Sequence, residues 1–239
     1  MSRTDSFLSE EEICSFHDSM HLFPTNAQTM VHNKQMMKSL NTPIARSIAE
    51  DENTYSNISS EDEQLERIVL LCNGEKVMLT SNLWVSAGLV NGSLGEIVTI
   101  FYKESTTPPQ IPTFVVVDFP KYIGPPWDER NPTHLPIPTV KRNGHAQIPL
   151  KMAWDLTIHK SQGMTLPKAT IDIGKTECQG LTFTAISKVA SLQDLRISPA
   201  FSFDHYSKMK DNKNIARRKH TKEILRSMPP PDNLLQPIF

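Results

Sequence analysis

The sequence lacks the cysteine pattern and the apolar runs that mark several protein classes. Its 239 residues include three cysteines, Cys14, Cys72 and Cys178, which lie far apart and form no CxxC pair. Neither a disulfide framework nor a zinc knuckle is therefore indicated. No apolar run approaches the length of a membrane span, and the opening segment MSRTDSFLSEEE has no cationic start followed by an apolar block. We expect an intracellular, soluble protein in a reducing compartment, without a membrane partner.

Nucleotide-binding and metal-binding motifs are also missing. None of the nine glycines begins a G-x-x-x-x-G-K-[ST] loop, and the sequence contains no GxGxxG, HExxH or GxSxG. A phosphate-binding loop needs those glycines so that its backbone amides can surround the phosphates. His17 and His21 have the helical spacing of metal ligands, but no third ligand lies nearby in the sequence. The sequence therefore predicts no self-contained enzyme site of these kinds and no metal site.

Charged residues are unevenly distributed, although the formal net charge is only −1. An acidic run covers Glu50–Glu66 and a basic run covers Lys208–Arg226, so a uniformly basic nucleic-acid coat is excluded but a local basic surface is not. The segment Glu50–Gln64 has no hydrophobic period, and we expect a solvated connector there. Asn212–Met228 is a candidate basic helix, which the prolines of PPPD end.

The first forty residues predict a helix, a strand and a second helix. Ser9 and Glu12 are spaced as a capping box, so LSEEEICSFHDS is expected to open a short helix. The apolar run MHLF ends at Pro24 and predicts a strand. Thr25 or Asn26 then serves as the N-cap of a helix whose apolar residues recur at helical spacing.

A series of short β-type runs begins at Ile68: IVLLC, KVMLT, GEIVTIFY and TFVVVDF. Asn73-Gly74 and Asn91-Gly92 stand between these runs, and Asn-Gly is a strong hairpin signal. The pattern predicts a small antiparallel barrel. The many prolines between Pro120 and Pro149 forbid central strands and favour an irregular connection that ends the barrel.

The remainder of the sequence indicates a parallel α/β arrangement. KMAWDLTIHKSQG fits either a strand or a helix that Gly163 ends, and its pattern alone leaves both interpretations open. The alternation at Ala169, Ile171 and Ile173 then predicts a buried strand, and LRIS predicts another. Between them lies a helical stripe of Leu181, Ala185, Val189 and Leu192, so a parallel βαβ crossover is expected. The fold class is therefore α/β, with the small β-barrel inserted.

The run TIHKSQGMTL, which occupies Thr157–Leu166, is the strongest candidate site. In open parallel sheets, ligands bind beyond the carboxyl ends of the strands. His159, Lys160 and the turn at Gly163 suit phosphate oxygens, while Gln162 could bond a sugar or a base. The alternative is a polar turn that simply faces water. Lys188 lies opposite an apolar helical stripe, so it too could be either a functional residue or a lysine that is simply solvated.

Five ordered blocks are very similar to the C-terminal half of the Pif-type (petite integration frequency) DNA helicases, of the 5′-to-3′ branch of superfamily 1. The blocks are LFPTNAQTMVHN, GEKVMLTSNLWVSAGLVNGSLGEIV, FPKYIGPPW, PLKMAWDLTIHKSQGMTLPKATIDIG and GLTFTAISKVASLQDLRISP. The resemblance covers roughly Met20–Tyr206, and five motifs in the same order make chance an unsatisfactory explanation.

The resemblance implies two RecA-like domains of the P-loop NTPase type with ATP between them, the second carrying an inserted β-barrel of the Src-homology-3 type. This sequence would supply the second domain (residues 1–63 and 150–206), the inserted barrel (64–149), and a basic helix with a proline-rich tail (207–239). It also implies that AWDLTIHKSQG is helical. A nuclear or mitochondrial location follows if the source is eukaryotic.

Site residues carried over from the family fall in three motifs. Motif IV contributes Pro24, Thr25 and Asn26 near the DNA, and motif V contributes Thr157, His159, Lys160 and Ser161 as DNA contacts. The resemblance also implies that Gln162, Gly163 and Ser187 couple the DNA site to the bound nucleotide. In motif VI, Lys188 stands where the family has an arginine finger, and Ala190 stands where a second arginine is common. Lysine provides a point charge in place of a planar fork, which predicts slow turnover.

The resemblance implies single-stranded DNA and a separate first RecA-like domain as partners of a monomeric chain. ATP and Mg²⁺ are expected only if that first domain is supplied, because its Walker loop and magnesium carboxylates are not in this sequence. The sequence begins with Met1, so we expect a truncated or degenerate gene product. The competing hypothesis is a non-enzymatic module that binds single-stranded DNA or a partner.

Overall fold

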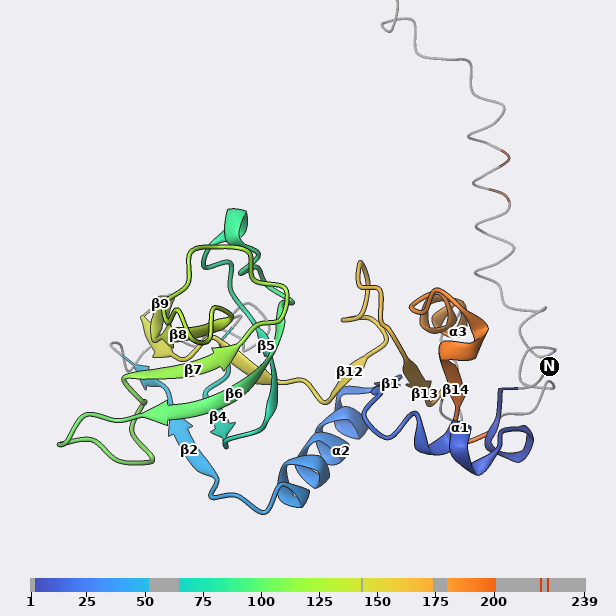
Figure 1. Cartoon of the computed structure of the whole chain (residues 1–239), viewed down its shortest axis with the longest axis horizontal. Helices are drawn as coiled ribbons and strands as arrows, with labels where there is room; N and C mark the ends of the chain where they lie inside the picture. The colour runs from blue at the N-terminus through green and yellow to red at the C-terminus, as the bar shows by residue number, and fades with distance from the viewer. Residues whose placement is uncertain are drawn as a thin grey trace, which may run out of the picture.

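The computed structural model describes residues 3–51, 65–142, 144–173 and 180–200, together with 220 and 223. Figure 1 shows antiparallel strands at one end of an elongated molecule and a parallel sheet at the other, with a long helix beside the junction. The basic run Lys208–Arg226, except for residues 220 and 223, the PPPD segment and most of the acidic connector lie outside the described residues. Within the described part, no helix is both long enough and apolar enough to cross a membrane.

Four short strands form the parallel sheet in the order β12-β1-β13-β14. They are β1 (Met20–Phe23), β12 (Asp155–Thr157), β13 (Ala169–Ile171) and β14 (Leu195–Ile197). Leu22 pairs with Leu156 on one side and with Ile171 on the other, which aligns apolar side chains on one face of the sheet. The strands predicted at MHLF, at Ala169 and at LRIS are confirmed.

The helical interpretation of AWDLTIHKSQG is wrong. Leu156 lies in strand β12, and a tight turn follows from Ile158 to Gly163. Pairing with β1 supplies the hydrogen bonds that this buried backbone needs, and Gly163 closes the turn at φ +78°. The strand interpretation, which the sequence pattern had left open, is therefore the correct one.

Two predicted helices at the start of the chain are confirmed. Helix α1 (Glu10–Cys14) begins with a capping box in which Ser9 and Glu12 each bond the other's backbone amide, and a short 3-10 turn, η1 (Asp5–Phe7), precedes it. Helix α2 (Asn26–Ser39) has Thr25 as its N-cap, since the Thr25 hydroxyl accepts a bond from the amide of Gln28.

The predicted βαβ crossover is present, but its helix is shorter than expected. Helix α3 (Leu181–Ile186) joins β13 to the parallel, adjacent strand β14. Leu181 and Ala185 are buried, as the stripe predicts, whereas Leu192 lies in a later 3-10 turn, η3 (Leu192–Asp194), and is 63% exposed. The helix ends at Ile186, and Val189 just beyond it forms a parallel β-bridge with Leu166.

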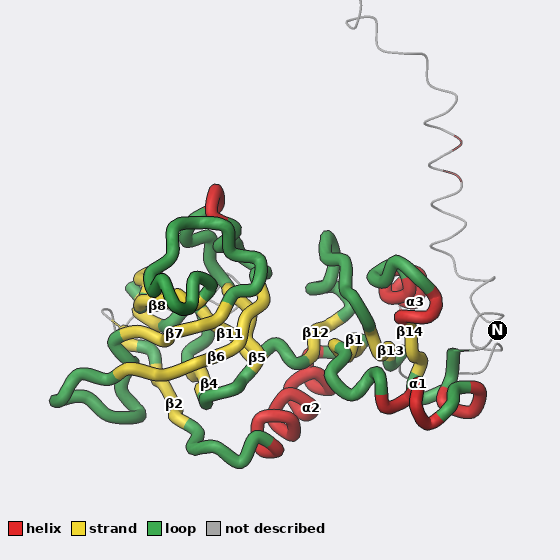
Figure 2. The backbone as a smooth tube through the Cα atoms, viewed as in Figure 1, coloured by secondary structure: helices red, strands yellow, loops and turns green. Residues whose placement is uncertain are grey.

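The middle of the chain forms antiparallel sheets (Figure 2). The largest has the order β11-β5-β6-β7-β8, and two smaller ones have the orders β2-β4 and β3-β10-β9. The strands are β2 (Ala45–Ile48), β3 (Glu50–Asp51), β4 (Ile68–Leu71), β5 (Lys76–Leu79), β6 (Leu94–Phe101), β7 (Phe114–Asp118), β8 (His134–Pro138), β9 (Val140–Arg142), β10 (His145–Gln147) and β11 (Leu150–Met152). A 3-10 turn, η2 (Val85–Ala87), lies between β5 and β6.

One of the two predicted hairpins forms and the other does not. Strands β5 and β6, on either side of Asn91-Gly92, pair antiparallel with Met78 opposite Leu94. Asn73-Gly74 makes a turn, with Gly74 at φ +81°, but β4 pairs with β2 and not with β5. Both edges of β5 are already occupied, by β6 and β11, so no edge is left for β4.

The expectation of an irregular connection between Pro120 and Pro149 is wrong in part, because strands β8, β9 and β10 lie there. Strand β8 contains Pro136 and Pro138 and is the outermost strand of its sheet. An edge strand needs no amide on its outer side, so prolines are tolerated at this position. The prediction that prolines exclude central strands holds for this sheet.

Two hydrophobic clusters correspond to the two kinds of sheet. Leu71, Ile97 and Val117 belong to the cluster of the antiparallel strands, and Leu22 and Leu156 belong to that of the parallel sheet. Met78 of strand β5 packs into the parallel-sheet cluster, so one side chain of the antiparallel sheet helps to join the two parts. The parallel and antiparallel parts are therefore in direct contact through apolar side chains.

Candidate functional site

A groove of about 1690 Å³ lies where the parallel and antiparallel parts meet. The residues that line it come from both parts: Asn26, Leu65–Ile68, Met78, Thr80, Gly88, Val90–Leu94, Phe119–Tyr122, Lys151, Lys160 and Gln162–Pro167. Pockets for small molecules usually measure about 300–1,000 Å³. The larger size suits an extended ligand such as a polymer strand.

Positive charges predominate in this groove, which we call the cationic groove. Arg67, Lys121, Lys151 and Lys160 line it, whereas Glu66 is the one acidic residue in its lining. Glu66 forms an ion pair with Lys151. Four cations thus face a single carboxylate within the lining, so the groove attracts anions.

Lys160 projects from the turn that follows strand β12. Partial loss of hydration lowers the pKa of its ammonium group, and the neighbouring charge of Lys151 lowers it further, although the residue as a whole is exposed. Two ammonium groups held close together favour a ligand that brings negative charge between them. A phosphate group would meet this requirement.

The turn after β12 is held by two of the predicted contact residues. Ser161 is fully buried, and its hydroxyl donates to the carbonyl of Ile158 at 2.7 Å. Thr157 is buried too, and its hydroxyl oxygen accepts a bond from the amide of Lys160 at 3.4 Å. These side chains fix the shape of the turn, while Gln162 and Gly163 reach the groove and His159 is exposed outside its lining.

The predicted residues after strand β1 lie directly beside this turn. The carbonyl of Phe23 accepts a bond from the amide of Ile158 at 2.9 Å, which joins the two segments. Asn26, the first residue of α2, is exposed and lines the groove. Thr25 is used as the helix cap, and Pro24 is half-buried outside the groove lining.

Ser187 and Lys188 lie apart from the cationic groove. Lys188 is 8% exposed, and among the described residues its ammonium group has no hydrogen bond or ion pair that we observe. Its carbonyl accepts a bond from the amide of Leu166 at 2.7 Å, and Leu166 does line the groove. Ser187 is exposed, with its hydroxyl donating to the carbonyl of Thr184. The predicted site residues thus occupy two neighbouring places.

Sequence reasoning missed the residues that the antiparallel part contributes. Arg67, Lys121 and Lys151 are single cations in three separate segments of the sequence, so no motif singles them out. Lys121 lies in the block FPKYIGPPW, whose pattern alone predicts no role for that lysine. Only the fold brings these cations opposite Lys160.

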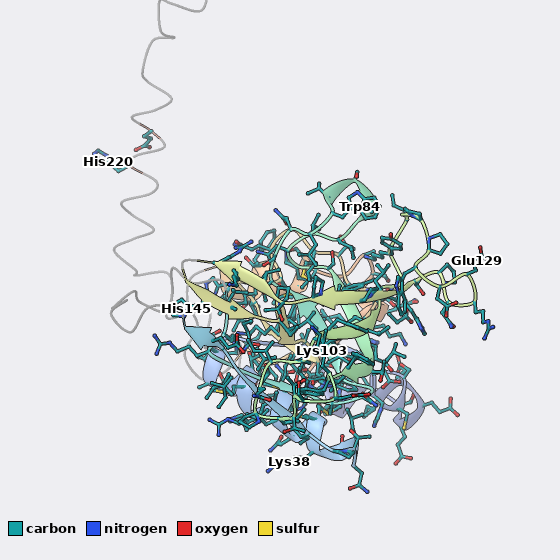
Figure 3. The ribbon with its side chains drawn as sticks, turned by 90° about the vertical axis from the view of Figure 1, so that its left-hand side faces the viewer. Lys38, Trp84, Lys103, Glu129, His145 and His220 are labelled. Atoms are coloured by element: carbon teal, nitrogen blue, oxygen red, sulfur yellow. The ribbon has the colours of Figure 1, made fainter. Side chains whose placement is uncertain are left out.

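An exposed aromatic side chain lies next to the groove. The ring of Trp84 meets that of Tyr122 edge-on at 6.4 Å, and Tyr122 lines the groove. Trp84 is 46% exposed and stands at the rim of the antiparallel part, beside η2 (Figure 3). The hydroxyl of Tyr122 donates to the carbonyl of Pro125 at 2.9 Å, which orients the ring pair.

Sequence comparisons connect the chain with DNA helicases. No family model matches. The chain is 36% identical over 138 residues to the ATP-dependent DNA helicase PIF1 of Homo sapiens, which covers 56% of this chain and 20% of that protein. It is 27% identical over 270 residues to the helicase PIF1 of Emericella nidulans, covering 90% of this chain and 35% of that protein. The chain therefore spans only about a fifth to a third of the length of these relatives.

Solved structures of helicases share this fold. The Pif1 helicase from Candida albicans matches 87% of this chain and 50% of its own, with a TM-score of 0.58 and 19% identity. The unliganded Pif1 from Bacteroides sp. matches 91% of this chain and 49% of its own, again with a TM-score of 0.58 and 19% identity. In sequence and in fold, the chain is thus related to a part of the Pif1-type DNA helicases.

Proposed function

We propose that this chain is the part of a Pif1-type helicase that holds single-stranded DNA beside the ATP cleft. The cationic groove is the observation that carries the proposal, because its size fits an extended ligand and its charge fits a phosphate backbone. A solved Bacteroides Pif1 of the same fold is bound to single-stranded DNA, which supports the choice of ligand. The sequence relatives are named as ATP-dependent DNA helicases.

Each side of the groove has its own part in this proposal. Lys151 and Lys160 neutralise phosphates, and Gln162 and Asn26 bond sugar or base edges. Trp84, at the rim, offers a ring on which a base can stack. Thr157 and Ser161 act through the turn that they hold, so their contribution is to position Lys160.

The proposed domain layout follows the family. Residues 1–63 and 150–206 form the second RecA-like domain, and 64–149 form an inserted barrel of the Src-homology-3 type. Two separate hydrophobic clusters support a division into two parts, although β2 and β11, which fall in the ranges proposed for the RecA-like domain, pair with strands of the proposed barrel. Residues 207–239 form a basic tail that adds affinity for DNA.

Nucleotide chemistry in this proposal needs a first RecA-like domain. That domain brings the phosphate-binding loop and the ligands of Mg²⁺, and Lys188 lies in the position from which a cation reaches the transferred phosphate. Gln162, Gly163 and Ser187 connect the DNA site with the nucleotide. The chain alone binds DNA without hydrolysing ATP.

A second candidate function is a DNA-binding module that has lost catalysis. The lysine at position 188 favours it, because an ammonium group cannot make the two parallel hydrogen bonds of a guanidinium. The two functions share the DNA-binding groove and differ in whether ATP is used.

Fluorescence anisotropy with a labelled oligonucleotide tests the shared part of the proposal. We expect the purified chain to bind single-stranded DNA at low salt, with an affinity that falls as salt rises. A folded chain that binds no DNA at low salt contradicts the proposal. Supplying the first RecA-like domain of an active Pif1 helicase then decides between the two functions, since only the first predicts DNA-stimulated ATP turnover.

A further inference from the structure

Three potential metal ligands meet on the sheet beside helix α2. His21 lies on β1, His32 on α2 and Asp155 on β12, and their ligand atoms all lie within 4.8 Å of one another. They are the one group of three such side chains found in the described part of the chain. His17, the partner that sequence spacing suggested for His21, is exposed and pairs with Asp18 instead.

Asp155 is held firmly in this cluster. It is 1% exposed, and one carboxylate oxygen accepts a bond from the amide of His21 at 3.1 Å. Asn33 of α2 bonds the Asp155 backbone at both its amide and its carbonyl, at 3.0 and 3.2 Å. The second carboxylate oxygen faces the ring of His32 and forms a hydrogen bond with its Nδ1 atom.

The two histidine rings are stacked on each other. Their centroids are 4.6 Å apart with an interplanar angle of 22°, and the ring of Phe23 borders His32 at 5.4 Å. His21 itself is only partly exposed. His32 keeps 28% of its side chain exposed, which leaves a path for an ion from solvent.

We propose that His21, His32 and Asp155 form a binding site for one borderline transition-metal ion, of which Zn²⁺ is the typical case. Two imidazoles and one carboxylate are a donor set that suits Zn²⁺ and disfavours Mg²⁺ and Ca²⁺, which take mainly oxygen ligands. Oδ1 of Asp155, the oxygen that does not face His32, is already bonded by the His21 amide, and such outer bonds commonly orient a metal-binding carboxylate. A water molecule would complete a tetrahedral site.

An ion at this site would require the ligand side chains to adjust, because their ligand atoms lie within 4.8 Å of one another but do not yet have coordination spacing. Zinc lies about 2.0–2.2 Å from nitrogen and oxygen ligands, so a tetrahedral site holds two ligand atoms roughly 3.4 Å apart. Nδ1 of His32 and the facing oxygen of Asp155 are closer than this, because a hydrogen bond joins them. The ion would replace the bridging proton, and the partly exposed ring of His32 would move outward to admit it.

The site would fasten helix α2 to two strands of the parallel sheet. Asn26, at the start of α2, lines the cationic groove, and the turn that carries Lys160 follows β12. An ion joining β1, α2 and β12 therefore stabilises the parallel-sheet side of the groove. The inference does not rest on the proposed DNA binding, because the ligands lie outside the groove lining.

Metal binding by the full chain, purified without a histidine tag and freed of metal by chelation, tests the proposal. We expect a visible-absorption titration with Co²⁺ to show a tetrahedral site, and equilibrium dialysis to show Zn²⁺ bound at that site. His32→Gln and His21→Gln should each weaken binding at least about tenfold, the loss expected when one of three ligands is removed. His17→Gln is the matched control, since His17 lies outside the cluster, and it should bind as the wild type does.

Thermal unfolding separates loss of the site from loss of the fold. Circular dichroism of the metal-free variants should match that of the metal-free wild type. Added Zn²⁺ should raise the Tm of the wild type and of His17→Gln but not of His32→Gln, because a ligand stabilises only the state that binds it. Absence of Co²⁺ and Zn²⁺ binding, or binding that survives unchanged in His32→Gln, overturns the proposal.

Discussion

The ammonium group of Lys151 is paired with the carboxylate of Glu66 in the wall of the cationic groove. Lys160 lies close enough for the charge of Lys151 to lower its pKa. Glu66 thus occupies, with a carboxylate of the protein, the place beside Lys151 that a DNA phosphate would take. DNA that enters the groove has to compete with this internal anion.

Glu66→Gln should therefore tighten the binding of single-stranded DNA. The variant removes the competing charge and the repulsion between Glu66 and phosphates, an effect on the order of 1 kcal/mol for a partly exposed pair, or about fivefold in Kd. Anisotropy titrations at low salt measure it. Glu104→Gln, on the exposed loop between β6 and β7, removes the same charge away from the groove and should change Kd much less. Equal effects of the two substitutions would show that overall charge, and not the groove, governs affinity.

Lys160→Ala should weaken DNA binding and reduce its dependence on salt. Each neutralised phosphate contributes roughly −0.7 to the slope of log K against log salt for a single strand, so loss of one contact should flatten the slope by about that amount. Lys103→Ala is the matched control, because Lys103 lies on the end of the antiparallel part that faces away from the parallel sheet (Figure 3). A slope that stays the same in Lys160→Ala would exclude Lys160 as a phosphate contact.

Trp84→Ala should weaken binding in a manner that salt hardly affects. A stacked base contributes about 1–3 kcal/mol, and this contribution does not depend on counterions. Trp127→Ala serves for comparison, since Trp127 is also exposed, at 57%, but neither lines the groove nor contacts Tyr122 in a ring pair. If the two substitutions have equal effects on Kd, the rim carries no specific base contact.

A hybrid protein tests the position of Lys188. When the first RecA-like domain of an active Pif1 helicase is joined before Met1, Lys188→Arg should raise the ATP turnover number at least about tenfold, which is roughly 1.4 kcal/mol in the barrier. Ala190→Arg, three residues beyond Ser187, is the control and should have a smaller effect. If the hybrid binds ATP and DNA but hydrolyses ATP at the same rate with lysine or arginine at position 188, then Lys188 does not lie in the catalytic cleft.

The order of most elements could be predicted from the sequence because their signals are local. The capping box of Ser9 and Glu12 and the cap at Thr25 depend on residues three positions apart, and both form as expected. The segment around Leu156 could not be settled in this way, because pairing with β1 decided between strand and helix. Likewise, the Asn73-Gly74 turn forms, but the strands that pair with β4 and β5 are distant in the sequence, so the turn does not produce a hairpin.

The candidate site was only half predictable for the same reason. Lys160 and Gln162 lie in a polar run that the sequence displays, whereas Lys151 and Lys121 reach the groove through the fold of the antiparallel part. Sequence reasoning also treated Ser161 as a contact, although its burial assigns it to the turn. A motif identifies a segment, but the side chains that face a ligand are determined by packing.

Glu75, in the turn before strand β5, should make the stability of the protein depend on pH. The residue is fully buried. One carboxylate oxygen accepts a bond from the amide of Cys72 at 3.2 Å, and the other has no hydrogen-bond partner among the residues that the structure describes. Burial raises the pKa of Glu75 to about 8, above the ordinary value of 4.5. Burial also raises the pKa of the Cys72 thiol, so that group stays neutral over the same range.

The sign of the effect follows from which state holds the proton more tightly. Below about pH 4.5 the Glu75 carboxyl is protonated in both states, and its full contribution to stability is present. As pH rises toward about 8, the unfolded chain ionises while the folded one keeps its proton, so the free energy of unfolding falls with a slope approaching about 1.4 kcal/mol per pH unit. Glu75→Gln, which is neutral in both states, should remove this slope. The variant should resemble the wild type at low pH and be more stable at high pH.

Urea denaturation followed by tryptophan fluorescence measures the difference when it is carried out at about pH 5.5 and about pH 8.5. The wild type should lose more stability between these conditions than Glu75→Gln does. Only the wild type has a carboxyl group that ionises readily in the unfolded chain but not in the folded core. Glu104→Gln, an exposed carboxylate replaced in the same way, should retain the dependence of the wild type. If Glu75→Gln loses as much stability as the wild type, the buried carboxyl is not the origin of the pH dependence. In that case the oxygen without a partner must obtain a hydrogen bond in solution that keeps the pKa of Glu75 near its ordinary value.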